Sequence, residues 1–230
     1  METLILFARP PIPGKTKTRL IPALGEVGAA RLYEAFLADA ARLAHKIRKS
    51  RTTVGLAAEW ALNRESPQAP LLARWLPGPF LHQIQTGSDL SQRMAVALGR
   101  RLTHGGRHAH HSRAVLIGTD FPDLPPEIIL EAFTALEKNE NAAALGPAKD
   151  RGYYLIGLNH LTPGVFTGIE WGGPGVFEAQ KKNLEALGYL IHTLPEWGDV
   201  DEPGDLENLR TRLGDNPSAA HATRTALGIN

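Results

Sequence analysis

The sequence predicts an α/β protein with a mixed, mostly parallel sheet. Short apolar runs alternate along the 230 residues with longer segments that carry an apolar residue every three or four positions. The first run, residues 3–8, is followed by a loop rich in Pro and Gly and then by an amphipathic helix at 26–48. The runs at 142–145 and 153–157 are too close for a parallel crossover, so we expect an antiparallel pair there.

The remaining segments continue the alternation. Strands are expected at 52–57, 81–85, 114–118 and 189–194, and helices from 88 or 89 to about 102, and at 125–138, 176–187 and 203–213, with a short helix within 66–79. No composition shift divides the chain. Residues 1–214 are therefore predicted to form one domain, and 215–230 a loose C-terminal tail.

Composition narrows the classes of function. Hydrophobic residues make up 43% of the chain and charged residues 21%, which is typical of a globular protein. A net charge of +1 gives no general attraction to nucleic acid. The absence of cysteine excludes disulfides, thiolate metal sites and cysteine nucleophiles, and fits a reducing cytoplasm. No stretch approaches the roughly 18 apolar residues of a membrane helix. Composition therefore gives no reason to expect a nucleic-acid partner or a membrane span.

Two acidic clusters follow predicted strands. Asp120 comes directly after the fourth strand, and Asp199 and Asp201 come after the last one. Ligands of open α/β sheets bind outside the carboxyl ends of the strands, so the clusters could meet and share one Mg²⁺ or Mn²⁺. Helix capping remains an alternative for two of these acidic residues, because Asp123 and Asp201 could each cap the helix that follows.

A basic loop follows the first strand. It carries Arg9, Lys15, Lys17 and Arg19 around a turn at Gly14. A P-loop is excluded, because position 9 is not glycine and three prolines remove backbone donors. The cations could converge on phosphate oxygens, or they could form an ordinary exposed loop.

Residues 146–154 lie between the two strands of the expected antiparallel pair. Small residues there would let a substrate approach the backbone. Asp150 could bind an acceptor and Arg151 an anion, although a simple turn would look the same.

Residues 85–94 could place backbone donors at a helix N-terminus near a nucleotide, or they could simply start a helix. The histidines of 104–111 lie among Gly, Arg and Ser, which favours a solvated loop over a metal site.

Taken together, these segments resemble one bacterial family of glycosyltransferase-like proteins related to phospholactate guanylyltransferase. Its members include radical-SAM/selenodomain-associated transferases and arsenosugar-biosynthesis glycosyltransferases. The resemblance runs collinearly over residues 3–210. It is carried by Phe7-Ala8-Arg9-Pro10, Pro13-Gly14-Lys15-Thr16-Lys17-Thr18-Arg19-Leu20, Gln85, Gly87, Leu90, Arg93, Ile117-Gly118-Thr119-Asp120, Pro122-Asp123-Leu124, Gly146-Pro147-Ala148, Asp150, Gly152-Tyr153-Tyr154-Leu155-Ile156-Gly157, Trp171, Asp199-Val200-Asp201, Pro203 and Asp205-Leu206.

The resemblance implies a Rossmann-like GT-A fold, the three-layer αβα sandwich of the nucleotide-diphospho-sugar transferases. It also implies a divalent ion at Asp120 with a second acidic position near Asp199 or Asp201. One departure stands out. The family pattern around the tyrosine pair is Asp-Gly-Gly-Tyr, and here Arg151 replaces the first glycine.

The expected function is metal-dependent transfer from a nucleotide-activated donor to a small-molecule acceptor, with an NDP-sugar as the first choice of donor. A nucleotidyltransferase that joins an NTP to a phosphorylated small molecule is the alternative, and a non-catalytic nucleotide-binding module is a third. The candidate residues are Asp120, Lys15 and Asp150 for catalysis; Arg9, Gly14, Lys15, Lys17, Arg19, Gln85, Gly87 and Arg93 for the nucleotide; Asp150, Arg151, Tyr153 and Trp171 for the acceptor; and Asp120, Asp201 and Asp199 for Mg²⁺ or Mn²⁺.

Overall fold

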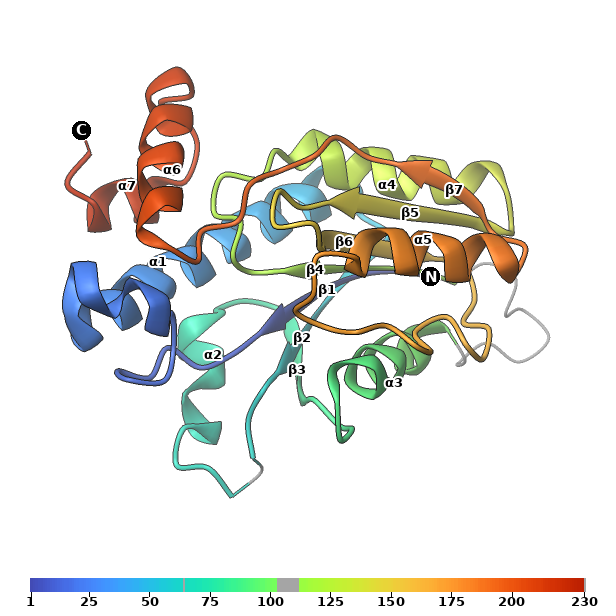
Figure 1. The fold of residues 1–230 in the computed structure, drawn as a ribbon, viewed down its shortest axis with the longest axis horizontal. Helices are drawn as coiled ribbons and strands as arrows, with labels where there is room; N and C mark the ends of the chain where they lie inside the picture. Colours follow the sequence, from blue (N-terminus) through green and yellow to red (C-terminus); the bar gives the residue numbers. More distant parts are fainter. Residues whose placement is uncertain (64, 103–111, 230) are drawn as a thin grey trace.

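The fold is a sheet between two layers of helices (Figure 1). The computed structural model describes residues 1–63, 65–102 and 112–229. Within these residues the strands form one seven-stranded sheet in the order β3-β2-β1-β4-β6-β5-β7. They are β1 (Glu2–Ala8), β2 (Val54–Trp60), β3 (Phe80–Ile84), β4 (Arg113–Gly118), β5 (Ala142–Pro147), β6 (Tyr153–Leu158) and β7 (Leu190–Thr193).

The sheet is mixed, as predicted. Strand β6 runs antiparallel to both of its neighbours, β4 and β5. The other neighbouring strands pair in parallel. The carboxyl ends of β1, β4, β5 and β7 therefore lie along the same edge of the sheet, and the loops that follow them can build a common site.

Helices cover both faces of the sheet. They are α1 (Ile21–Ser50), α2 (Leu72–Trp75), α3 (Leu90–Leu102), α4 (Pro126–Lys138), α5 (Val176–Ala186), α6 (Pro203–Asp215) and α7 (His221–Ala226), with short 3-10 helices at Thr18–Leu20 and Ala69–Leu71. Helices α1, α2, α4 and α6 share one apolar core with the sheet, and α3 and α5 share the other. In β1, Leu4 and Leu6 face the first core and Ile5 the second, as expected of a strand buried on both sides.

The first helix begins earlier than the periodicity predicts. Residues from Ile21 already form a helical turn, and Gly25 then breaks the regular geometry with a φ of 69° before the main helix runs to Ser50. Glycine adopts this left-handed conformation without the steric cost that a side chain would add. No helix in the described part of the chain is both long enough and apolar enough to cross a membrane.

The predicted cap at Asp123 is wrong. Pro125 stands at the N-cap of α4 and makes no side-chain cap hydrogen bond. The Asp123 carboxylate is buried and accepts from Arg212 of α6, with Nε 2.6 Å from Oδ2. Asp123 therefore fastens the last long helix to the loop that follows β4.

The predicted cap at Asp201 is also wrong, because the next residue takes that position. Glu202 is the N-cap of α6 and forms a capping box with Asp205. The Asp205 carboxylate also accepts from the backbone N–H of Asp201 at 2.9 Å. This arrangement leaves the Asp201 side chain available for other contacts.

The expectation of a loose tail is wrong as well. Helix α7 packs on α1. The buried carboxylate of Asp39 accepts from the backbone N–H groups of Ala222 and Thr223, at 2.9 and 2.8 Å. A side chain of α1 thus caps a helix that is distant in sequence, and local patterns do not reveal such a contact.

Asp39→Ala should release α7 from α1. It removes both acceptors of the helix N-terminus, and we expect a loss of about 1–2 kcal/mol in the free energy of unfolding. Asp39→Asn, which keeps one acceptor oxygen, should lose less. Denaturant unfolding measures the first effect, and hydrogen exchange at Ala222 and Thr223 should rise in parallel. Unchanged exchange in Asp39→Ala would contradict the capping role.

Candidate functional site

Two adjoining cavities lie at the carboxyl edge of the sheet. The smaller, of about 180 Å³, is lined by the basic loop after β1. The larger, of about 280 Å³, is lined by residues that follow β4, β5 and β7 together with side chains of α3 and β6. Asp120 and Asp201 line both. The two acidic clusters meet here, as expected from their positions after the carboxyl ends of two strands.

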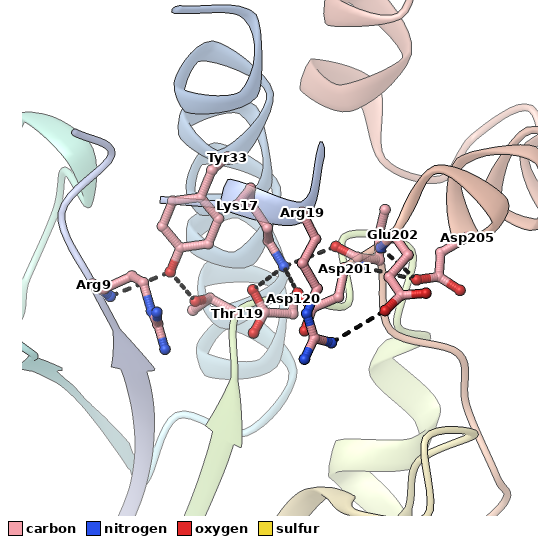
Figure 2. A network of polar contacts seen from close by, with 10 residues as sticks. Arg9, Lys17, Arg19, Tyr33, Thr119, Asp120, Asp201, Glu202 and Asp205 are labelled. Carbon is pink, nitrogen blue, oxygen red and sulfur yellow. Dashed lines mark hydrogen bonds and ion pairs between the residues drawn. The ribbon is translucent and has the colours of Figure 1, made fainter. Parts of the chain in front are cut away.

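The buried ammonium of Lys17 lies between these two carboxylates (Figure 2). Its Nζ is 2.5 Å from Oδ1 of Asp120, 2.6 Å from Oδ1 of Asp201 and 2.8 Å from the carbonyl oxygen of Val200. An ammonium has three N–H donors, and three acceptors surround this one. Lys17 therefore ties the basic loop to both acidic segments.

Lys17 and the two carboxylates stabilise each other's charged forms. Burial acts to lower the pKa of Lys17, but Asp120 and Asp201 outweigh it and raise the pKa above its ordinary value. Burial acts to raise the pKa of Asp201, but the Lys17 ammonium, together with Arg9 and Arg19, outweighs it and lowers that pKa. The rings of Tyr33 and Phe36 lie 5.7 and 5.6 Å from the ammonium, within the range of cation–π attraction.

Tyr33 of α1 holds the ends of two strands in place. Its hydroxyl oxygen accepts from the backbone N–H of Arg9 at 3.2 Å and lies 2.6 Å from Oγ1 of Thr119. Burial, followed by the nearby charge of Asp120, raises the pKa of Tyr33 to about 12, so the phenol stays protonated. The sequence marks Tyr33 as part of the apolar face of its helix and gives no sign of this second role.

The smaller cavity is rich in positive charge. Arg9, Lys15 and Arg19 are exposed there, and Arg19 pairs loosely with Glu202 at 3.3 Å. The sequence predicts that Lys17 binds phosphate together with these cations. Its three donors are instead engaged with the two carboxylates and with the carbonyl of Val200. The full lining is Arg9, Lys15, Lys17, Thr18, Arg19, Asp120 and Asp201.

The larger cavity has an aromatic wall. The rings of Tyr153 and Trp171 meet edge to face, with centroids 6.1 Å apart. The indole N–H of Trp171 donates to Oγ of Ser91 at 2.8 Å, and that hydroxyl donates to the carbonyl of Phe166 at 3.0 Å. These bonds fix the loop that carries Trp171 against α3. Met94 and Val176 extend the apolar surface.

The rest of this cavity is acidic. Asp150 and Asp199 line it together with Asp120 and Asp201. Oδ1 of Asp150 accepts from the N–H of Gly152 at 2.8 Å, which fixes the carboxylate in a tight turn. Burial first, and then the charges of Asp150, Asp201 and Asp205, raise the pKa of Asp199 to about 6. Carboxylates therefore crowd one side of the cavity.

Several predicted nucleotide contacts have local structural roles and line neither cavity. The amide of Gln85 donates to the carbonyls of Ala8 and Glu59 at the ends of β1 and β2. Gly87 has a φ of 141°, and a Cβ there would lie 2.8 Å from the nitrogen of Arg93. Nε of Arg93 donates to the carbonyl of Gly87. Gly14, at φ 75°, forms the turn of the basic loop and is likewise not among the residues that line the cavities.

Arg151 lies at the rim of the larger cavity. It is exposed, and its neighbours Asp150 and Gly152 line the cavity while Arg151 does not. Its φ of 71° is left-handed, a conformation that suits the glycine found there in the family pattern. The turn sets the direction of Arg151, because its N–H donates to the carbonyl of Ala148.

Among the described residues, no group of three or more His, Asp or Glu side chains is arranged to hold a metal ion. The histidines of 104–111 lie outside those residues. Carboxylate ligands at this edge would therefore need other oxygens, such as those of a substrate, to complete a coordination shell.

Replacing Lys17 with methionine should destabilise the fold. The change leaves Asp120 and Asp201 facing each other without a cation. We expect a loss of about 2–3 kcal/mol, less than for a fully buried pair because both carboxylates are more than a third exposed. Lys15→Met is the matched control, since Lys15 is exposed in the same loop. Denaturant unfolding at neutral pH measures both. Equal stabilities would contradict the central role of Lys17.

Comparisons with known proteins identify the family and the fold of the chain. Residues 41–173 match the family DUF2064, described as an uncharacterized protein conserved in bacteria. The crystal structure of a "putative nucleotide-diphospho-sugar transferase" from Desulfovibrio desulfuricans G20 is 30% identical and has a TM-score of 0.85, with 98% of this chain and 93% of that one covered. No curated protein matches.

More distant structures share the fold alone. CMP:2-keto-3-deoxy-manno-octonic acid synthetase, solved with CTP, is 10% identical, has a TM-score of 0.55 and covers 93% of this chain and 98% of its own. A 4-diphosphocytidyl-2C-methyl-D-erythritol synthase is 11% identical, has a TM-score of 0.54 and gives the same coverages of 93% and 98%. The predicted α/β fold of GT-A type is thereby confirmed. The chain belongs to the DUF2064 family and has the nucleotide-diphospho-sugar transferase fold.

Proposed function

We propose that this protein is a transferase that takes a sugar from an NDP-sugar and passes it to a small-molecule acceptor. The donor diphosphate would bind in the smaller, cationic cavity, and the acceptor in the larger one. The observation that carries the proposal is the pair of carboxylates, Asp120 and Asp201, which line both cavities. The bond to be broken would lie where the cavities meet.

The smaller cavity suits a diphosphate. Arg9, Lys15 and Arg19 supply exposed cations around a space of about 180 Å³. Arginine can bind phosphate through two parallel hydrogen bonds, and lysine acts as a mobile point charge. As the sugar departs, negative charge grows on the diphosphate, and cations already in place stabilise it. Lys15 would act in this way during catalysis.

Asp120 and Asp201 also suit Mg²⁺ or Mn²⁺. Each turns one oxygen to Lys17, yet their side chains stay 35% and 43% exposed toward the cavities. Hard carboxylate oxygens together with substrate phosphates are the usual ligands of Mg²⁺. When bound, the ion would neutralise charge on the leaving diphosphate. Asp199 lines only the larger cavity and would act as an outer member of the set.

Asp150 would receive the proton of the acceptor. It lines the larger cavity, and its bond to the N–H of Gly152 holds the carboxylate in a fixed orientation. A positioned carboxylate within hydrogen-bond reach of a hydroxyl can act as a general base. Tyr153 and Trp171 would pack against the acceptor, and Arg151 would stand at the entrance.

Nucleotidyl transfer to a phosphorylated molecule is the second candidate. The fold is shared with a CMP:2-keto-3-deoxy-manno-octonic acid synthetase solved with CTP and with a 4-diphosphocytidyl-2C-methyl-D-erythritol synthase, and the family resemblance to phospholactate guanylyltransferase points the same way. Sugar transfer is preferred because the relative at 30% identity is described as a "putative nucleotide-diphospho-sugar transferase". A binding module without turnover would show nucleotide affinity with every acceptor inactive.

Calorimetric titration and analysis of the reaction products together separate these candidates. NDP-sugars, NTPs and free nucleoside diphosphates are titrated into the full chain with and without Mn²⁺, and each mixture is then analysed for released sugar, transferred sugar and pyrophosphate. We expect at least one NDP-sugar to bind and to be hydrolysed slowly or transferred. Release of pyrophosphate from an NTP would favour nucleotidyl transfer, and absence of any nucleotide binding would refute the proposal.

Lys15→Ala and Arg19→Ala should each weaken nucleotide binding. Each removes a charged hydrogen bond to phosphate, which corresponds to about 1–3 kcal/mol of binding free energy. Lys138→Ala, an exposed cation at the far end of α4, should leave the affinity unchanged. Unchanged affinity in both loop variants would instead favour an ordinary solvated loop.

Asp201→Asn should abolish the gain in nucleotide affinity that Mn²⁺ provides. The substitution removes a negative ligand while Asp120 still pairs with Lys17. Titrations with Mn²⁺ and with EDTA measure the difference. Asp215→Asn, at the exposed end of α6, is the control and should keep the full gain. A gain that persists in Asp201→Asn would remove Asp201 from the proposed metal ligands.

A further inference from the structure

We propose that the larger cavity selects an acceptor without phosphate or carboxylate, namely a hydroxyl- or amino-bearing molecule with an apolar face. The inference rests on the proposed function and adds the chemical class of the acceptor. It depends on the charges around the cavity and on the nature of its wall.

The charges of the cavity wall are of one sign. Asp120, Asp150, Asp199 and Asp201 line it, and its described lining holds no Lys, Arg or His. A phosphate or carboxylate bound there would face carboxylates without a cation to pair with. Bringing such a charge out of water without a partner is costly. A neutral hydroxyl can donate to the same oxygens, and an ammonium can pair with them.

The neighbouring cations act on Asp120 and Asp201 and not on the rest of the acidic wall. Lys17 neutralises part of the pair Asp120 and Asp201, and its three donors are engaged. Asp150 and Asp199 have no such partner among the ion pairs of the described residues. Arg151 is exposed outside the cavity. A divalent ion at Asp120 and Asp201 would be matched by the diphosphate of the donor.

The opposite wall determines the shape of the acceptor. Tyr153 and Trp171 present aromatic surface, held in place by the bond from Trp171 to Ser91. Met94 and Val176 add apolar contacts. Such a wall packs against a ring or a hydrocarbon face, and an aromatic ring also attracts a cation. The site therefore combines an apolar side with an acidic side.

This combination separates the two transferase candidates. The phosphorylated acceptor of the alternative would bring negative charge into the acidic cavity. An alcohol, a polyol with an apolar face or an amine would not. The acceptor class thus follows from Asp150 and Asp199 independently of which nucleotide binds.

A series of three probes of one size and shape tests the inference. The probes are 4-(hydroxymethyl)benzylamine, 4-methylbenzyl alcohol and 4-(hydroxymethyl)benzoate, which are cationic, neutral and anionic at pH 7. Binding to the full chain is measured by ligand-detected NMR, without nucleotide and with saturating nucleoside diphosphate and Mg²⁺. We expect the amine to bind at least tenfold more tightly than the benzoate, with the neutral alcohol between them.

Variants locate the effect in the cavity. Asp150→Asn keeps an oxygen for the N–H of Gly152 and removes the charge, so the preference for amine over benzoate should fall several-fold. Trp171→Ala should weaken all three probes, and the amine most, because the indole packs against each ring and also attracts the ammonium. Asp215→Asn, which removes a charge elsewhere, should leave the preference as it is.

The outcomes separate this inference from the proposed function. Benzoate binding as tightly as the amine, or no binding of any probe, would overturn the inference even if nucleotides bind normally. An unchanged preference in Asp150→Asn would overturn it too. A failure of nucleotide binding would refute the proposed function, while the order of probe affinities could still be read, because it requires no turnover.

Discussion

The contacts of Lys17 with Asp120 and Asp201 are the interaction on which the site depends. They join the loop after β1, the end of β4 and the segment before α6, which are distant in sequence. A buried ammonium without partners would be strongly unfavourable, so the loop and both acidic segments must reach this arrangement together. A cation inside the protein thereby defines where the outer faces of the two carboxylates point.

Further contacts hold the acidic segments in position. The backbone N–H of Val200 donates to the carbonyl of Asp120, which holds the two acidic segments beside each other. Asp205 accepts from the N–H of Asp201, and Arg212 pairs with Asp123 on the other side. Helix α6 therefore acts as the support of the Asp199–Asp201 segment. The side chains of Asp120 and Asp201 are therefore positioned through their backbone segments and through Lys17.

The two cavities divide the charges of the edge between them. Exposed cations of the basic loop surround the smaller, and carboxylates and aromatic rings surround the larger. Opposite fields in neighbouring cavities would let one molecule be held by its phosphates and another by its hydroxyl or amino groups. The shared carboxylates stand at the boundary, which is where a group would pass from one to the other.

The sequence by itself determined the order of strands and helices, the mixed sheet and the acidic and basic positions at the strand ends. These features are local, since apolar periodicity and the antiparallel pair can be read within short windows. Asp120 and Asp150 could be found in this way, and the family resemblance marks Tyr153 and Trp171. The meeting of the two acidic clusters was also expected, because the carboxyl ends of parallel strands share an edge.

Only the tertiary structure decided which of these residues line the cavities. Lys17 and Lys15 are two positions apart in one basic loop, yet Lys17 is buried against Asp201, 184 residues away, and Lys15 is exposed. Tyr33 and Thr119, 86 residues apart, meet in the same way. Asp39 caps a helix near the C-terminus that local signals did not reveal. Such choices depend on burial and on partners brought together by folding, and no local pattern of residue types contains either.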